Sequence, residues 1–210
     1  MQRLIAFLKI LCQRGFFHSQ ELSTFAGTEE YHFHHVLLRD VAYQALLKSD
    51  RQAYHGQAAA WLIGATQSCG RTGEFASIIA ENYESADERI LAAEWYTQAG
   101  IRARNQGAPL QARHFFDRAL TLLPNDLTPL SNPDDLERSW QVLTGRDEVL
   151  GILGETEARL ADDMALVTLA QTIGHDQYLA EAYYRQGYYF GMSGHYPQEL
   201  VAYTQGLAAS

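Results

Sequence analysis

Cysteine and lysine are scarce in this sequence, and each shortage excludes classes of protein. The 210 residues include two cysteines, Cys12 and Cys69, which lie far apart and form no Cys-x-x-Cys pair. A disulfide framework is therefore excluded, and the reducing cytoplasm is the expected compartment. Lys9 and Lys48 are the only lysines, and the formal net charge is −9. A polybasic membrane patch is excluded and a nucleic-acid surface is not expected, because both need clustered cations.

Long apolar runs are missing as well. The longest ones fall far short of the roughly 20 residues that a membrane-spanning helix needs. Lys9 interrupts the apolar N-terminal stretch, and no small-residue cleavage site follows it, so a signal peptide is not expected. Hydrophobic residues make up 47% and charged residues 20% of the chain. This balance predicts a packed soluble protein that has no membrane partner.

Proline is rare and concentrated in one segment. Three of the five prolines fall within residues 124–135, which end in the helix-start signal Asp134-Asp135. We therefore predict a linker at 124–135 between two regions of helical pattern, 48–123 and 136–210. Residues 1–47 differ from both, because their pattern indicates a helix, a short aromatic β-hairpin and a second helix.

A 34-residue frame that starts at Ala93 matches a repeat pattern. Small residues at positions 8, 20 and 27 let two antiparallel helices approach closely, an aromatic residue at position 24 fills the gap, and a proline ends the second helix. These are the consensus positions of tetratricopeptide repeats, which places one repeat at 93–124. The residues in the frame are Gly100, Gly107, Ala112, Phe116, Ala119 and Pro124.

A second frame starts at Ala180 and indicates a last repeat that the chain cuts short. It places Gly187 at position 8 and Tyr203 at position 24. We predict four helical hairpins stacked as an all-α, tetratricopeptide-like solenoid; the alternative is a helical bundle without repeats. The other two predicted hairpins are 50–64 with 74–85, around the loop 67–73, and 136–153 with 155–173, which turns at Gly154 and closes at Gly174.

The segment 33–43 carries a more specific resemblance. It resembles the end of the winged-helix module in bacterial STAND-class ATPases, above all in multidomain regulators that join such an ATPase to a cyclase, kinase or transcription-factor domain. In that family a Phe-x-His strand leads into a helix and then into tetratricopeptide-like repeats. The matching residues are Phe33, His35, Leu37, Arg39, Asp40, Val41, Ala42 and Tyr43.

This resemblance implies a longer parent protein. The ATPase core of the family precedes the winged helix, and its phosphate-binding Gly-x4-Gly-Lys-Ser/Thr pattern is missing from this sequence. We expect this chain to be a fragment with a partial winged helix, working with an upstream NTPase domain. A histidine at the start of the family's helix contacts the ADP phosphate, so the resemblance assigns nucleotide sensing to His35. The alternative is that His35 caps its helix or packs locally.

The repeat frames also predict a binding groove. Positions 2, 5, 9, 12 and 13 of each first helix line the concave face in tetratricopeptide repeats, which points to Arg104, Asn105, Tyr184 and Tyr188 as residues that contact a protein or peptide ligand. Aromatic side chains in a groove are typical binding hot spots. The alternative is that a further repeat buries the tyrosines.

Other clusters of functional residue types are weaker signals. His32, His34 and His35, with His18 on the facing strand, suggest a metal site, because residues 32 and 34 share one strand face at ligand-like spacing. Exposed histidines on a hairpin are the favoured interpretation, and no metal site or cofactor is predicted. Asp162 and Asp163 are interpreted as part of a solvated helix face, not as an acid–base pair. No catalytic motif is present, so we expect a protein that is not an enzyme.

Two functions from different classes fit these patterns. The first is a non-catalytic helical-repeat segment that receives a protein or peptide signal and relays it to an upstream NTPase. The alternative is a winged-helix, DNA-binding transcriptional regulator with a helical oligomerisation tail. It is disfavoured by a charge of only +1 over residues 1–56. The truncated last repeat also predicts self-association through its uncapped end.

Overall fold

Most of the chain is helical in the computed structural model, which describes residues 2–25, 27–67 and 69–209 and the side chains from residue 6 onward. These residues form ten α-helices, one short 3₁₀ helix and a two-stranded antiparallel sheet, so the predicted all-α fold with a β-hairpin is confirmed. Residues 1 and 210, at the ends of the predicted domains, and Ser68, in the predicted loop 67–73, lie outside the described residues. The elements are α1 (Gln2–Gln13), β1 (Phe17–Ser19), β2 (Tyr31–Phe33), α2 (Val36–Gln44), α3 (Lys48–Gln67), η1 (Thr72–Phe75), α4 (Ala76–Ser85), α5 (Arg89–Asn105), α6 (Pro109–Leu122), α7 (Pro133–Leu153), α8 (Thr156–Ile173), α9 (Asp176–Met192) and α10 (Tyr196–Ala209).

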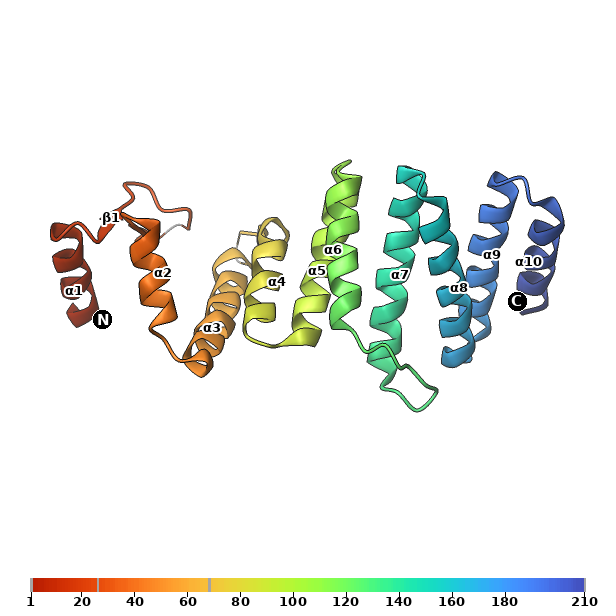
Figure 1. The fold of residues 1–210 in the computed structure, drawn as a ribbon, viewed down its shortest axis with the longest axis horizontal. Helices are drawn as coiled ribbons and strands as arrows, with labels where there is room; N and C mark the ends of the chain where they lie inside the picture. Colours follow the sequence, from red (N-terminus) through yellow and green to blue (C-terminus); the bar gives the residue numbers. More distant parts are fainter. Residues whose placement is uncertain (1, 26, 68, 210) are drawn as a thin grey trace.

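The helices follow one another in a row from the N-terminal to the C-terminal end of the molecule (Figure 1). At the N-terminal end, α1, the β-hairpin and α2 form a small unit, called the N-terminal unit below. Strands β1 and β2 place Phe17 opposite Phe33 and His18 opposite His32, and the two phenylalanine rings lie 4.4 Å apart. The predicted helix, hairpin and helix over residues 1–47 are therefore present.

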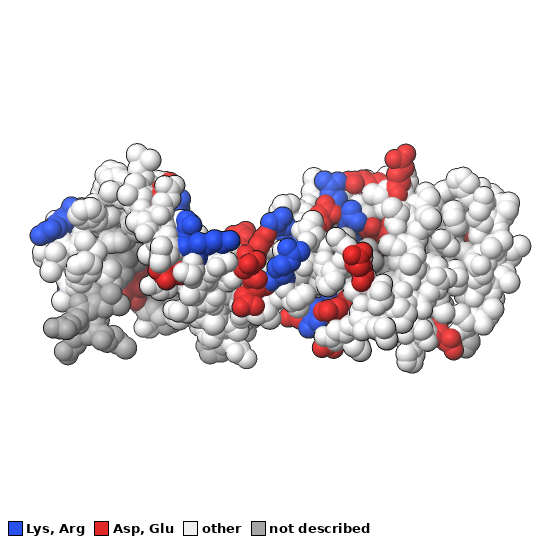
Figure 2. Space-filling view, turned by 60° about the horizontal axis from the view of Figure 1, so that its bottom comes forward, with Lys and Arg blue, Asp and Glu red and all other residues white. Residues whose placement is uncertain are grey.

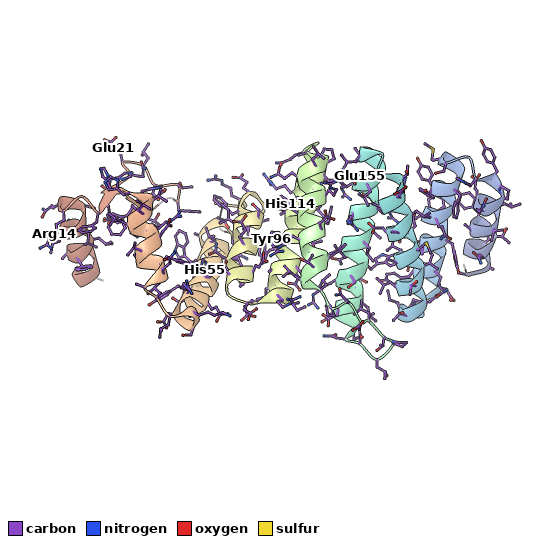
Figure 3. The ribbon with its side chains drawn as sticks, viewed as in Figure 1. Arg14, Glu21, His55, Tyr96, His114 and Glu155 are labelled. Carbon is purple, nitrogen blue, oxygen red and sulfur yellow. The ribbon has the colours of Figure 1, made fainter. Side chains whose placement is uncertain are left out.

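One chain of side-chain hydrogen bonds ties this unit to the helical body. His55, on α3 (Figure 3), bonds through Nε2 to the hydroxyl of Tyr43 on α2 and through Nδ1 to Oδ1 of Asn82 on α4, each at 2.9 Å. The guanidinium of Arg51 lies 5.1 Å from the centre of the Tyr43 ring. Tyr43, the last residue of the motif at 33–43, thus joins α2 to the first hairpin.

The four predicted hairpins are α3 with α4, α5 with α6, α7 with α8, and α9 with α10. Both repeat frames predict a small residue facing an aromatic one, and both contacts are present. A Cβ added to Gly100 would lie 2.9 Å from the Phe116 ring, and one added to Gly187 would lie 2.6 Å from the Tyr203 ring. Only glycine lets the two helices of each hairpin approach this closely.

The ends of the third hairpin follow from single residues. Gly154 and Gly174 close α7 and α8 in the left-handed conformation, at φ of 72° and 73°, which glycine adopts without steric cost. Helix α6 ends at Leu122, two residues before Pro124, as predicted. Helix α7 begins at Pro133, three residues earlier than the predicted linker allows, because proline is favoured in the first turn of a helix.

The core is divided into clusters that lie between successive helices. The largest cluster lies between α4, α5, α6 and α7, and Phe116 at its centre is fully buried. A second cluster forms around Trp140, Leu166 and Ala182, where α7, α8 and α9 meet. Among the described residues, no helix has both the length and the apolar character needed to cross a membrane.

The start of α7 offers a test of local helix capping. Asn132 is the N-cap residue, and its side chain accepts a hydrogen bond of 3.1 Å from the backbone N–H of Asp134. Asn132→Ala removes this acceptor, so we expect the free energy of unfolding to fall by about 1 kcal/mol. Urea denaturation followed by circular dichroism measures the change. The matched control is Asn125→Ala, at an exposed loop position; an equal loss in both variants would contradict the capping role.

Candidate binding groove

A groove of about 450 Å³ opens where α7, α8 and α9 meet. Tyr184 and Tyr188, both predicted as groove residues, line it from α9, and they are 61% and 45% exposed. Large aromatic side chains left this accessible beside charged groups are available to a ligand. The lining residues are Asp147, Glu148, Arg159, Glu181, Tyr184, Arg185 and Tyr188.

A buried carboxylate organises the floor of the groove. Asp147 is 1% exposed and accepts hydrogen bonds from Nε of Arg159 at 2.8 Å and from Nη1 of Arg185 at 3.0 Å. Both carboxylate oxygens are therefore paired, as a buried charge requires. The Arg159 guanidinium also lies 5.4 Å from the centre of the Tyr188 ring. The floor thus holds one tyrosine of the groove wall in place.

The accessible charge of the groove is negative. Glu148 and Glu181 have side chains 44% and 41% exposed, whereas those of Arg159 and Arg185 are only 16% and 18% exposed. Arg185 pairs with Glu181 at 2.9 Å and with Glu148 at 3.5 Å. A ligand that enters would meet carboxylates and tyrosine rings before it meets the arginines.

The other two predicted groove residues lie outside this lining. Arg104, at the end of α5, pairs with Glu148 and so connects the second hairpin to the groove from its side. Asn105 is exposed at the end of the same helix and is not part of the lining. The structure therefore brings Tyr184 and Tyr188 together in one groove and connects Arg104 to that groove through Glu148.

The interpretation of Asp162 and Asp163 as a solvated face is wrong. They are 4% and 0% exposed, because α8 is covered by both α7 and α9 at this level. Arg146 pairs with Asp162 at 2.7 Å, but neither oxygen of Asp163 accepts a hydrogen bond from any described residue. Burial, with the nearby charge of Asp147, raises the pKa of Asp163 to about 7, and burial raises that of Asp162 to about 6 although Arg146 opposes it.

Sequence reasoning missed the charged floor of the groove. Asp147 lies one helical turn from Leu143 and from Leu150, and Asp163 lies between Leu160 and Leu166 at the same spacing. A carboxylate on the apolar stripe of a helix is a signal for a buried ion pair or an unpaired buried acid. Arg159 and Arg185 carry no comparable signal, because arginine is common on exposed helix faces.

A second cavity, also of about 450 Å³, adjoins the groove on its C-terminal side. Tyr184 lines both, and its ring lies 5.9 Å from the ring of Tyr203. The chain after Arg185 contains one charged residue, Glu199. Figure 2 accordingly shows charged side chains over the middle of the molecule and few at its C-terminal end. The lining of this apolar cavity is Ala180, Tyr184, Tyr203, Gly206 and Leu207.

The histidines of the N-terminal unit are exposed. His35 is the N-cap of α2, but its side chain caps no described backbone group, and its ring packs 4.8 Å from that of His34. The ring of His18 lies 5.6 Å from that of His32, which in turn bonds to Glu30 at 2.7 Å. Within the described ranges, no group of three or more His, Cys, Asp or Glu side chains is placed to hold a metal ion.

No model of a known protein family matches the chain, and no curated protein matches it. The similarity of residues 33–43 to the winged helix of STAND-class ATPases therefore stays a hypothesis. The groove is the candidate functional site, because it combines accessible tyrosine rings with a buried carboxylate, Asp147, that is paired with two arginines.

Proposed function

We propose that this chain is a non-catalytic helical-repeat segment that binds a protein or peptide ligand in the groove between α7, α8 and α9. The observation that carries the proposal is the pair of exposed tyrosines, Tyr184 and Tyr188, above a floor held by ion pairs to Asp147. Exposed aromatic residues on a pre-organised support bind partners at low entropic cost. Such a surface suits recognition and does not by itself provide catalytic chemistry.

We further propose that the chain relays this binding to an upstream NTPase domain, as the resemblance to STAND-class regulators implies. Charged contacts join the second hairpin to the third: Arg104 pairs with Glu148, and Arg113 pairs with Glu155 at the turn between α7 and α8 (Figure 3). At the far end, His35 is exposed at the start of α2 and is accessible to a phosphate on a neighbouring domain. Hairpins held together by such contacts are a suitable relay.

Site-specific photocrosslinking in the native protein tests the groove. A benzophenone amino acid in place of Tyr184 or Tyr188 is expected to crosslink the partner in the cells that make the protein, because both side chains face the groove. The matched control places the same group at Leu130, which is 97% exposed and lies in the loop before α7. Immunoblotting for a product of increased mass measures the result.

Crosslinking with equal yield from all three positions would contradict groove binding, since it would mean non-specific contact. The relay is tested separately by deleting residues 93–210 from the intact protein. We expect loss of partner binding and unchanged nucleotide binding, because the repeats and the NTPase domain are separate units. Partner binding that survives the deletion would overturn the proposal.

A further inference from the structure

The charged groove and the apolar cavity share one wall. Tyr184 faces the carboxylates of α7 and α9 on one side, and on the other side it packs against Tyr203 of α10. A ligand that lies across this tyrosine must therefore present two different kinds of side chain to the two cavities. The cavities have the same volume, about 450 Å³ each, which is enough for one large side chain with part of its backbone.

The charged groove selects for a cation. Its two half-exposed charges are Glu148 and Glu181, and its arginines are withdrawn into the floor. The groove already holds one guanidinium against a tyrosine ring, that of Arg159 beside Tyr188. A tyrosine face and a carboxylate together are what an arginine or lysine side chain of a ligand binds best. An acidic ligand would be repelled at the rim.

The neighbouring cavity selects for an apolar group. The residues of its lining contribute almost no polar surface and include no charged side chain, and the chain after Arg185 carries a single charge, at Glu199. Burial of an apolar side chain here favours binding in proportion to the area removed from water. A charged side chain would lose its hydration and find no charged partner in the lining. The two cavities thus differ sharply in what they accept.

We propose that Tyr184 divides a two-part site for an extended segment of a partner protein in which a basic side chain stands next to a large apolar one. The basic side chain binds between Tyr188 and Glu181, and the apolar side chain fills the cavity in front of Tyr203. This inference rests on the proposed function, because it names the chemistry of the ligand that the groove takes.

Display selection with a library of short random peptides on the whole chain tests the proposal. We expect enrichment of arginine or lysine next to leucine, phenylalanine or tryptophan. In a synthetic, fluorescein-labelled copy of the most enriched peptide, replacing the basic residue by glutamate should weaken binding by about tenfold or more, because attraction to the rim becomes repulsion. Fluorescence anisotropy measures each dissociation constant.

Variants of the chain test whether the enriched peptide binds at Tyr184 and Glu181. Tyr184→Ala is expected to abolish binding of the enriched peptide, and Glu181→Gln to weaken it by about five- to tenfold, because one charge-assisted contact is lost. The matched control is Glu157→Gln, an exposed carboxylate on α8 that does not line the groove, and it should leave binding unchanged. Circular dichroism spectra confirm that each variant is folded.

The outcomes separate this inference from the function on which it rests. Peptides that bind through Tyr184 but carry acidic residues, or apolar residues alone, would overturn the two-part site and leave groove binding intact. Enriched peptides whose binding is unaffected by Tyr184→Ala would overturn the two-part site as well. A selection that recovers no binder would overturn both proposals.

Discussion

Phe116→Ala is expected to lower the free energy of unfolding by about 3–5 kcal/mol. The Phe116 side chain is fully buried, and its ring lies between two glycines on different hairpins. A Cβ added to Gly100 on α5 would lie 2.9 Å from the ring, and one added to Gly145 on α7 would lie 2.6 Å from it. Truncation therefore opens a cavity at the junction of two hairpins.

Denaturant unfolding followed by circular dichroism measures this loss. The matched control is Phe7→Ala, because Phe7 is 57% exposed on α1, and we expect a change of less than about 1 kcal/mol there. Similar losses at Phe7 and Phe116 would contradict the central position of the Phe116 ring.

A substitution at Gly145 tests the same contact by adding atoms beside the Phe116 ring instead of removing the ring. Gly145→Ala should cost about 1–3 kcal/mol, because the new methyl group overlaps the Phe116 ring. In a Phe116→Leu background the smaller side chain leaves room for that methyl group. The cost of Gly145→Ala should then vanish, since alanine is the better helix former by about 1 kcal/mol. A cost that persists in the double variant would show that the ring is not what excludes a side chain at Gly145.

The second large effect is expected from Asp163→Asn, which should raise stability at neutral and alkaline pH. In the folded chain, burial raises the pKa of Asp163 from 3.8 to about 7. Above about pH 4 the unfolded chain ionises this carboxyl while the folded chain keeps it protonated. The free energy of unfolding therefore falls with rising pH until the folded carboxyl ionises near pH 7.

The groups that face Asp163 come from three helices. Asp147 on α7 and Asp162 on α8 raise its pKa, whereas Arg159 on α8 and Arg185 on α9 lower it, and burial outweighs the two arginines. We expect ionisation of Asp163 in the unfolded chain to remove about 1.4 kcal/mol of stability for each pH unit between about pH 4 and pH 7, a loss that the asparagine variant avoids. The variant should thus be more stable than the natural chain at pH 8 and gain little at pH 4.

Thermal and denaturant unfolding at several pH values checks this prediction. The difference between the variant and the natural chain at each pH is the quantity to compare, because it isolates the contribution of Asp163. Asp126→Asn, at an exposed position in the loop before α7, is the matched control and should leave the pH dependence unchanged. Parallel pH curves for Asp163→Asn and the natural chain would contradict the prediction.

Much of the fold could be predicted because its signals are local. Glycine at 154 and 174, proline at 124 and the small residues of the two repeat frames each act through backbone conformation or through contact within one hairpin. The pairing of Gly100 with Phe116 and of Gly187 with Tyr203 follows from such spacing, and the structure contains both contacts. The hairpin order then follows from the short connections.

The floor of the groove could not be predicted in the same way. Periodicity shows that Asp163 lies on a particular face of α8, but it does not show how many neighbouring helices cover that face. Gly145 contacts a ring in the preceding hairpin, a relation that no repeat frame in its own hairpin indicates. Both relations arise between hairpins, where residues far apart in the sequence meet.

The sequence alone determined the helical class, the turns, the two aromatic contacts within hairpins and the position of Tyr184 and Tyr188 on the first helix of the last hairpin. The reason is that helix propensity, capping and close approach depend on residues within one or two turns of each other. Only the tertiary structure decided that Asp147 and Asp163 are buried, that Arg159 and Arg185 form a floor beneath the tyrosines, and that Tyr184 separates a charged groove from an apolar cavity. Burial and pairing of charge depend on which helices pack against which, and that is settled only when the hairpins stack.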